Sequence, residues 1–241
     1  MFCGMPSMVE IYERHADRYD ELVAAEDYRG NVKATLHRIA AWEGAEVIEA
    51  GVGTGRVTKL YIDTAARAVC CDRSRHMLDY TRATLTAYAS KITYSVADNM
   101  QFPRIEGDFD LFIEGWSFGH SAMESSDDED LVRITERLVG GAERNLVPGG
   151  TAIVLETLGT NVDEAAAPHP TLKRFYDLLE REHGFVREEI RTDYRFETVD
   201  DAARVMGFFF GPGMERGVRE RSSTTIPEWT GVWSKRVASP S

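Results

Sequence analysis

The chain has 241 residues, which suits one α/β domain, and 43% of them are hydrophobic, which is enough for a full core. Its formal net charge of −12 disfavours a nucleic-acid partner, because proteins that bind phosphate backbones usually present a basic face. No apolar run approaches the length that crosses a bilayer and no signal peptide is visible, so we also expect no membrane partner.

Two helices are predicted first, from Val9 to Ala25 and from Tyr28 to Trp42. Strand and helix patterns then alternate along the chain. This alternation predicts βαβ units and a parallel sheet that is covered on both faces. The expected succession is a strand at Val47–Ile48, a helix at Val57–Thr64, a strand at Ala68–Cys71, a helix at Arg75–Ser90, strands at Ile92–Val96 and Phe109–Ile113, a helix at Asp128–Gly140, a strand at Thr151–Glu156 and a helix at Thr171–Glu182.

The C-terminal part departs from this strict alternation. Phe185 to Phe196 alternates like a strand, Val199 to Phe209 reads as a helix, and Ser222 to Val237 reads as a strand that Pro227 interrupts. Two strands around one helix permit an antiparallel pair at the edge of the sheet. The segment 205–221 is left open between a lid over the site and a buried helix end followed by a loop.

The cysteines and histidines bear on the cellular location of the protein and on whether it binds a metal ion. Cys3, Cys70 and Cys71 form no C-x-x-C pair and are odd in number, so a reducing cytoplasm is the expected location. The six histidines show no i, i+4 pair and no neighbouring cysteine ligands. We therefore expect no metal site.

A glycine-rich turn carries the strongest functional signal. Gly51, Gly53 and Gly55 follow the first predicted strand and precede a helix, and such a turn lets the backbone approach a ligand closely. The dinucleotide pattern G-x-G-x-x-G fails in both registers, since its third glycine would fall on Arg56 or Thr58. Glu49 precedes these glycines, where a carboxylate would repel a pyrophosphate but attract an ammonium and a sulfonium.

The segment Glu49-x-Gly51-x-Gly53-x-Gly55 resembles the first motif of the class I S-adenosylmethionine (SAM)-dependent methyltransferases. The resemblance implies a doubly wound α/β fold: a mostly parallel seven-stranded sheet with an antiparallel edge strand, helices on both faces and an N-terminal helical cap. It implies one domain over 1–241, with the cap at 1–42, a cofactor-binding core at 43–160, and acceptor-side and C-terminal edge strands at 161–241. The implied activity is methyl transfer from SAM to a small-molecule acceptor.

Acidic residues follow the second and third predicted strands. Asp72 is placed to hold the cofactor's ribose, although an Asp there also caps helices, and Met77 lies one turn into the next helix. The resemblance implies that Asp98 meets the adenine amino group and that Asn99 and Met100 border the ring. A plain turn formed by the Asp-Asn pair is the alternative.

The fourth predicted strand leads into Glu114 and Trp116, where an acceptor should meet the cofactor. Trp116 or Phe118 is expected near the sulfonium, where a cation–π contact contributes about 0.5–2 kcal/mol, or else in the core. His120 is the candidate general base, with a structural histidine as the alternative. The resemblance also implies that Tyr19, in the first helix, faces the methionyl end of the cofactor.

Two other functions stay open at this stage. An NAD(P)-dependent oxidoreductase would use a similar turn, and a non-catalytic SAM-binding module would bind the cofactor without turnover. The sequence is compatible with a homodimer and does not identify the methyl acceptor or the atom that is methylated.

Overall fold

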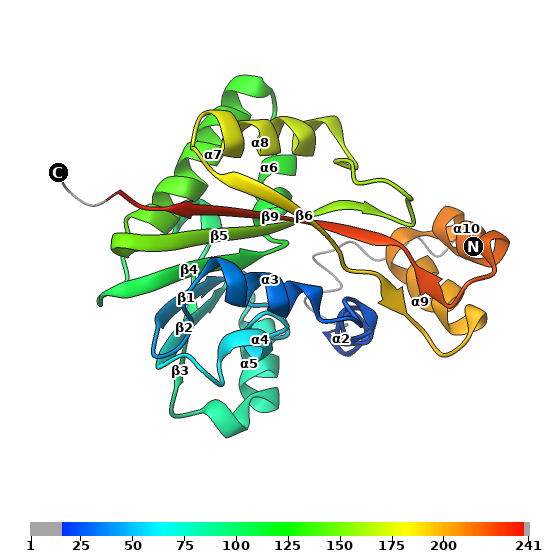
Figure 1. Ribbon diagram of the computed structural model, residues 1–241, viewed down its shortest axis with the longest axis horizontal. Coiled ribbons are helices and arrows are strands. Elements are labelled where there is room, and N and C mark those ends of the chain that lie inside the picture. The colour runs from blue at the N-terminus through cyan, green and yellow to red at the C-terminus, as the bar shows by residue number, and fades with distance from the viewer. Residues whose placement is uncertain (1–15, 239–241) are drawn as a thin grey trace.

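The computed structural model describes the backbone of residues 16–238 and the side chains from residue 18 onward. Seven strands form one sheet in the order β3-β2-β1-β4-β5-β9-β6 (Figure 1). Their bounds are β1 Glu46–Ala50, β2 Arg67–Asp72, β3 Ile92–Val96, β4 Phe109–Gly115, β5 Leu146–Thr160, β6 Val186–Arg191 and β9 Glu228–Arg236. β9 pairs antiparallel with both β5 and β6, whereas β1 to β5 are mutually parallel. The prediction of a doubly wound, mostly parallel seven-stranded sheet with an antiparallel edge strand is confirmed, except that the antiparallel strand β9 lies one place in from the edge strand β6.

Helices cover both faces of this sheet, as Figure 1 shows. One face packs on α3 (Asn31–Ile39), α4 (Thr58–Tyr61) and α5 (Arg75–Thr84), and the other on α6 (Phe118–Met123), α7 (Asp128–Glu143) and α8 (Pro170–Arg181). Buried aliphatic and aromatic residues of the strands alternate between the two resulting cores, because successive side chains of a strand point to opposite faces. Short 3-10 helices occur at η1 (Thr86–Tyr88) and η2 (Asn99–Gln101).

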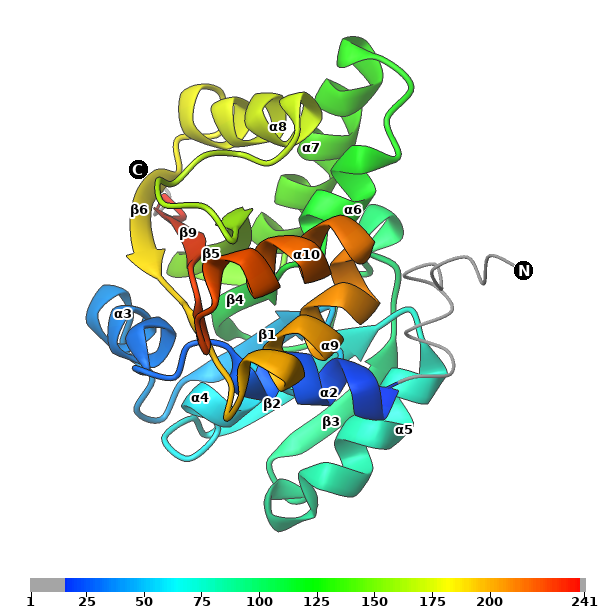
Figure 2. The ribbon, with the colours of Figure 1, turned by 90° about the vertical axis from the view of Figure 1, so that its right-hand side faces the viewer.

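A third, smaller core lies beside the carboxyl ends of the strands. It joins α2 (Ala16–Ala25), α9 (Val199–Phe210) and α10 (Pro212–Arg221) to a two-stranded sheet of β7 (Tyr194–Arg195) and β8 (Thr225–Ile226). Figure 2 views these three helices side by side in front of the strand ends. This group of elements, which we call the cap, therefore lies where the fold places its ligands.

The order of the strands sets the position of the site. The chain proceeds outward from β1 to β3 and then returns to β4 on the other side of β1. Crevices form at such a reversal, because the loops after the two central strands diverge. The glycine turn follows β1 and the Trp116 loop follows β4, so both border this crevice.

Several predicted elements differ from the observed ones. The strand predicted over Phe185–Phe196 is two strands in two sheets, β6 and β7, and the one over Ser222–Val237 divides at Pro227 into β8 and β9 because proline lacks the N–H that a ladder needs. No loop follows the helix end in the segment Gly207 to Gly213: α9 ends at Phe210, Gly211 with φ 88° joins the two helices, and Pro212 begins α10.

Three helices of the N-terminal half are shorter than predicted, whereas α7 extends to Glu143 and α9 to Phe210, beyond their predicted ends. α3 and α4 lose residues at both ends, α5 ends at Thr84 before η1, and α6 was not predicted. The start of the first predicted helix at Val9 lies outside the described residues. Among helices of the described chain, none is both long and apolar enough to span a membrane.

Candidate active site

The glycine turn adopts a backbone that requires glycine at its first and last positions. Gly51 has φ 66°, and a Cβ there would lie 2.4 Å from both Cβ and Oγ of Ser117. Gly55 has φ 78°, and its Cβ would lie 2.8 Å from Cγ2 of Thr81. The turn therefore packs tightly against the β4–α6 loop on one side and α5 on the other.

A cavity of about 630 Å³ opens beside this turn. The loops after β1, β2, β3 and β4 form its walls, together with one residue of the cap, Tyr19. Of the residues that the sequence assigns to the site, eight line it: Tyr19, Gly51, Gly53, Asp72, Asp98, Asn99, Trp116 and His120. The structure thus brings together residues that are up to 101 positions apart in the chain (19 to 120).

Asp72 connects the ends of β1 and β2. Its Oδ2 accepts the N–H of Gly53 at 3.0 Å, and its Oδ1 accepts the N–H of Ser74 at 2.8 Å. The cap of α5 is Ser74, whose Oγ accepts the N–H of Met77 at 3.3 Å, so Asp72 does not serve as that cap. Burial raises the pKa of Asp72. Its carboxylate lines the cavity, where a ligand hydroxyl would compensate for part of the lost hydration.

The loop after β3 is a short turn at the cavity wall. Asp98 accepts the N–H of Met100 on Oδ1 at 2.7 Å, which begins η2, and Asn99 donates from Nδ2 to Ser117 Oγ at 3.1 Å. Asp98 and Asn99 therefore form a turn and also line the cavity, so the two alternatives do not exclude each other. Asp98 is exposed, so its second carboxylate oxygen is accessible to a ligand.

Two buried carboxyl groups hold the β4–α6 loop. Glu114 accepts on Oε2 the N–H of Ser117 at 3.0 Å, its hydroxyl at 2.8 Å and the N–H of Phe118 at 3.1 Å. Glu156 of β5 accepts the N–H of Gly119 on Oε1. These bonds satisfy N–H groups at the start of α6 that have no partner within the helix. Burial raises the pKa of Glu114 to about 7, and burial together with the Glu114 charge raises that of Glu156 well above its usual range.

The same loop presents Trp116 and His120 to the cavity. Trp116 has φ 56°, a left-handed conformation that costs an L-residue about 1–2 kcal/mol. His120 is on α6 with an exposed side chain. Desolvation by the cavity wall, and next to it the positive charge of Arg73, lower the pKa of His120. The imidazole is therefore neutral, and able to accept a proton, at physiological pH.

Five other predicted site residues do not line this cavity: Glu49, Gly55, Met77, Met100 and Glu114. Strand alternation turns Glu49 toward α4, where its Oε2 accepts hydroxyl groups of Thr58 and Tyr61, each at 2.7 Å. Burial raises the pKa of Glu49 to about 7. Its predicted pairing with the cofactor's ammonium stays a prediction.

Met77 and Met100 turn away from the cavity in different ways. Met77 is 1% exposed, and Met100 packs against the core under α6 and α7. Sequence reasoning did not assign the further lining residues, of which the charged or polar ones are Arg73, Ser74, Arg75, His76, Ser117, Ser121 and Glu124. The sequence does contain a signal for these residues, because most of them follow the end of a predicted strand. Strand ends of a parallel sheet meet at one crevice.

The donors and the shape of this site fit SAM. The turn brings its backbone to the cavity at Gly51 and Gly53, and Asp72 and Asp98 line the same cavity with carboxylate acceptors. The volume lies within the range of pockets for small ligands and cofactors. Within the part of the chain that the structure describes, no group of three or more His, Cys, Asp or Glu residues is placed to bind a metal ion.

Comparisons with known proteins agree with this geometry. Residues 47–150 match a family model described as a methyltransferase domain. An uncharacterised methyltransferase of Anoxybacillus flavithermus is 27% identical over 179 residues, which are 71% of this chain and 78% of the relative. Fold, glycine motif and these matches support a class I SAM-dependent methyltransferase.

Solved structures of other proteins have the same fold as this chain. A methyltransferase structure from Bacillus halodurans aligns with a TM-score of 0.55 at 17% identity, covering 87% of this chain and all of that one. Phosphoethanolamine N-methyltransferase 2 of Haemonchus contortus, solved with phosphomonomethylethanolamine and S-adenosylhomocysteine (SAH), aligns with a TM-score of 0.57 at 14% identity, covering 93% and 57%. The match to a methyltransferase domain implies SAM as the cofactor, in agreement with the failed third glycine of the dinucleotide pattern.

Proposed function

We propose that the protein methylates a small-molecule acceptor. The observation that carries this proposal is the cap: α2, α9 and α10 share a core beside the strand ends, and Tyr19 of α2 reaches the cavity wall and contacts the ring of Phe209 in α9. A site bordered in this way suits a compact acceptor better than a polymer. The Haemonchus enzyme, solved with phosphomonomethylethanolamine, supports this choice.

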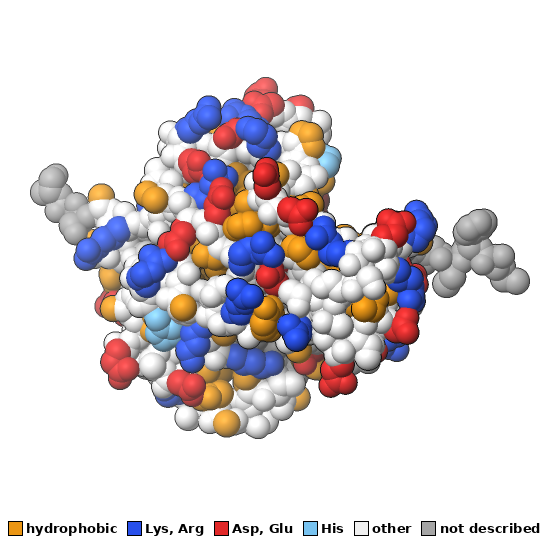
Figure 3. All heavy atoms as spheres, turned by 45° about the vertical axis from the view of Figure 1, so that its right-hand side comes forward, with side chains coloured by type: hydrophobic (Ala, Val, Ile, Leu, Met, Phe, Trp, Pro, Cys, Tyr) orange, Lys and Arg blue, Asp and Glu red, His pale blue; other side chains and the backbone are white. Residues whose placement is uncertain are grey.

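Surface charge supports the same choice. Figure 3 shows basic and acidic side chains interspersed over the face it draws, without a large area of one sign. The net charge of −12 adds a general repulsion for phosphate backbones. A nucleic-acid acceptor is therefore disfavoured.

The residues have distinct proposed roles. Asp72 and Asp98 hold the ribose and the adenine, and the backbone at Gly51 and Gly53 holds the methionyl end. When bound, SAM supplies an electrophilic methyl group, and the walls of the site align the acceptor with it. Alignment alone can contribute about 7–11 kcal/mol to the barrier reduction, so a base is required only where the acceptor must lose a proton. His120 is the candidate for that step.

The proposal is tested by binding and turnover together. Calorimetric titration with SAH, and with NADH as the competing ligand, should show saturation with SAH alone. SAH release from SAM should then be measured over panels of small alcohols, amines, thiols and carboxylates, with a transfer RNA mixture as the polymer control. Saturation by NADH alone would exclude the cofactor assignment, and turnover with RNA alone would exclude the acceptor class. SAH binding without turnover on any panel would favour a non-catalytic SAM-binding module.

Location and assembly remain proposals. Cys70 and Cys71 are buried free thiols, which favours a reducing compartment such as the cytoplasm. The homodimer and the division at residues 42 and 160 also stay predictions.

A further inference from the structure

Trp116 is held in the cavity wall by its backbone and by contacts of its ring. Its N–H donates to the carbonyl of Leu155 in β5 at 2.7 Å, and the two residues that follow it donate to Glu114. The ring is partly buried and packs against the core that α3 and α4 cover. Apolar packing is non-directional, so it does not by itself set the plane of the ring. That plane depends on a charged neighbour.

The neighbour is Arg56, which directly follows the glycine turn. Its guanidinium carbon Cζ lies over the Trp116 ring, 3.8 Å from the centre, and a cation–π contact extends to about 6 Å. A planar guanidinium can stack on an aromatic ring, whereas a lysine ammonium acts as a point charge. The side chain of Arg56 is 17% exposed, so water competes little for this contact.

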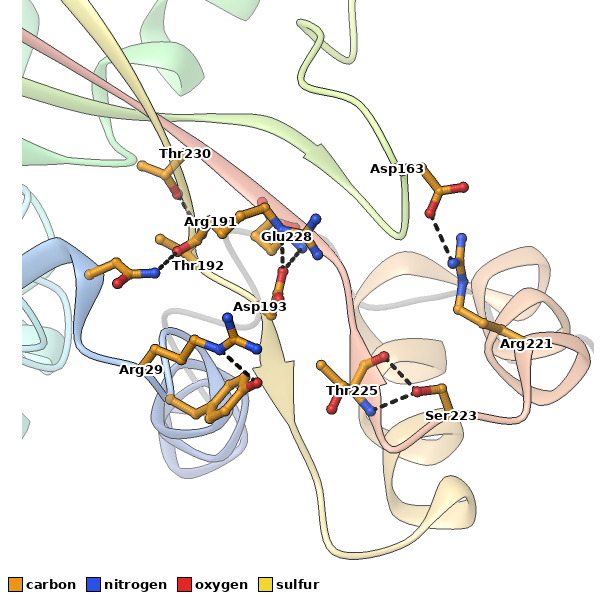
Figure 4. A network of polar contacts seen from close by, with 12 residues as sticks. Arg29, Asp163, Arg191, Thr192, Asp193, Arg221, Ser223, Thr225, Glu228 and Thr230 are labelled. Carbon is orange, nitrogen blue, oxygen red and sulfur yellow. Dashed lines mark hydrogen bonds and ion pairs between the residues drawn. The ribbon is translucent and has the colours of Figure 1, made fainter.

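Glu26 fixes the guanidinium in turn. Arg56 donates from Nη1 to Oε2 of Glu26 at 2.9 Å, and the side chain of Glu26 is 5% exposed. Glu26 directly follows α2, and the N–H of the next residue, Asp27, donates to the carbonyl of Thr192 at 3.1 Å. Thr192 lies between β6 of the main sheet and β7 of the cap (Figure 4). Arg56 thus connects the end of a cap helix to the ring of Trp116.

The same helix reaches the glycine turn at a second place. Tyr19 of α2 lines the cavity, and its Cε1 lies 3.8 Å from the position that a Cβ on Gly53 would occupy. A shift of α2 would therefore disturb the wall directly at Tyr19 and, through Arg56, at Trp116. Arg56 and Glu26 are not among the described residues that line the cavity. Their contact with its wall is the one that Arg56 makes with Trp116.

We propose that Arg56, fixed by Glu26, is a positioning residue that acts through Trp116. It holds the indole in the wall of the cavity and ties the orientation of that ring to the position of the cap. The inference rests on the proposed function, which assigns this cavity to SAM and the acceptor. It predicts that a change at Arg56 affects ligand binding without any contact between Arg56 and the ligand.

Fluorine NMR shows the state of the ring without any ligand. The chain has four tryptophans, so incorporation of fluorotryptophan gives four resonances, and that of Trp116 is identified by its absence from Trp116→Leu. The wild type should show one narrow Trp116 resonance, because the ring has a single orientation. Arg56→Lys keeps the charge beside Glu26 and removes the planar group, so it should shift or broaden this resonance.

A second stack of the same kind provides the matched control. Arg191 lies over the Trp229 ring, 4.8 Å from its centre, and donates to Asp193 at 2.7 Å, a pair that Figure 4 shows. These three residues are not among those that line the cavity. Arg191→Lys should alter the Trp229 resonance, which Trp229→Phe identifies, and should leave the Trp116 resonance and the affinity for SAH unchanged.

Calorimetric titration with SAH shows whether the orientation of the ring serves the ligand. Arg56→Lys and Trp116→Leu should each weaken SAH binding at least tenfold. The double variant should bind SAH within about threefold of Trp116→Leu, because Arg56 has nothing to position once the indole is absent. A purely structural role would instead lower the midpoint of thermal unfolding and leave the SAH affinity of the folded variant unchanged.

The outcomes separate this inference from the proposed function. A broad Trp116 resonance in the wild type, an unchanged one in Arg56→Lys, wild-type SAH affinity in that folded variant, or additive losses in the double variant would refute the inference. If Arg56→Lys does not fold, Glu26→Gln takes its place with the same expected changes, since it keeps an acceptor for Arg56 but removes the charge. Absence of SAH binding by the wild type would refute the proposed function, and the fluorine spectra would still show whether Arg56 positions the ring.

Discussion

Gly51→Ala tests whether the glycine turn and the β4–α6 loop form one packed unit. The new Cβ would lie 2.4 Å from Cβ and Oγ of Ser117, well inside van der Waals contact, and at φ 66°. The left-handed backbone costs about 1–2 kcal/mol for an L-residue, and overpacking costs typically about 1–3 kcal/mol more. We expect a loss of about 2–5 kcal/mol in the free energy of unfolding.

Gly44 provides the matched control. It has nearly the same backbone, with φ 69°, but an added Cβ would meet no atom within 4 Å. Gly44→Ala should therefore lose only the backbone contribution of about 1–2 kcal/mol. Urea unfolding of both variants isolates the steric contribution of Ser117 as the difference between them.

Calorimetry with SAH shows whether this packing serves the cofactor. Displacing Ser117 would move the neighbouring Trp116 in the cavity wall and break the hydrogen bond between Ser117 and Asn99. The affinity of Gly51→Ala for SAH should therefore fall at least tenfold, while Gly44→Ala should keep the affinity of the wild type. Equal unfolding free energies for the two variants would refute the packing. Wild-type affinity in a folded Gly51→Ala would refute the location of the cofactor.

Three further predictions address single side chains. Asp72→Asn should weaken SAH binding about tenfold or more, since hydrogen bonds to charged groups are worth about 1.5–3 kcal/mol, and unchanged calorimetric affinity would contradict the ribose assignment. Glu49→Gln should change the pH dependence of stability, because the pKa of Glu49 rises on folding from 4.5 to about 7. The free energy of unfolding of the wild type should therefore fall as the pH increases from 4.5 to about 7 and not above that range. Over this range the wild type should lose about 3 kcal/mol more than the variant. Urea unfolding at pH 5 and pH 8 measures this difference, and parallel losses in both proteins would disprove it. His120→Gln should leave SAH affinity unchanged and, with an acceptor that must lose a proton, reduce kcat by about 10²–10⁴-fold, whereas undiminished turnover would assign His120 to the wall alone.

Local sequence signals were sufficient to predict the strands of the parallel sheet and the glycine turn. The alternation of short apolar runs with helical periods predicted β1 to β5, and the spacing of Gly51, Gly53 and Gly55 predicted a backbone that the structure confirms by positive φ at all three positions. Asp72 and Asp98 were located because strand ends in a parallel sheet share one edge. In each case the information lay within about ten residues of the position concerned.

Features that depend on distant partners could not be predicted in this way. Glu156 holds the start of α6 from 37 positions away, and Arg56 pairs with Glu26 across 30 positions. Without these contacts the segment around Gly119 reads as a loop and Arg56 as a surface residue. The inward direction of Glu49 follows from which face of β1 meets α4, which the alternating pattern alone does not specify.

The β4–α6 loop shows why such long-range contacts matter for the chemistry. Trp116 occupies a backbone conformation that costs about 1–2 kcal/mol, and three hydrogen bonds to Glu114 stabilise the turn around it. Those bonds need a buried carboxyl, and the neighbouring Glu156 makes it harder to ionise both groups, so the pair retains a proton more readily than exposed acids do. The wall of the site is consequently held by hydrogen bonds within the protein that do not involve an acceptor. That is the property required of a site in which alignment, rather than a strong base, contributes most of the rate.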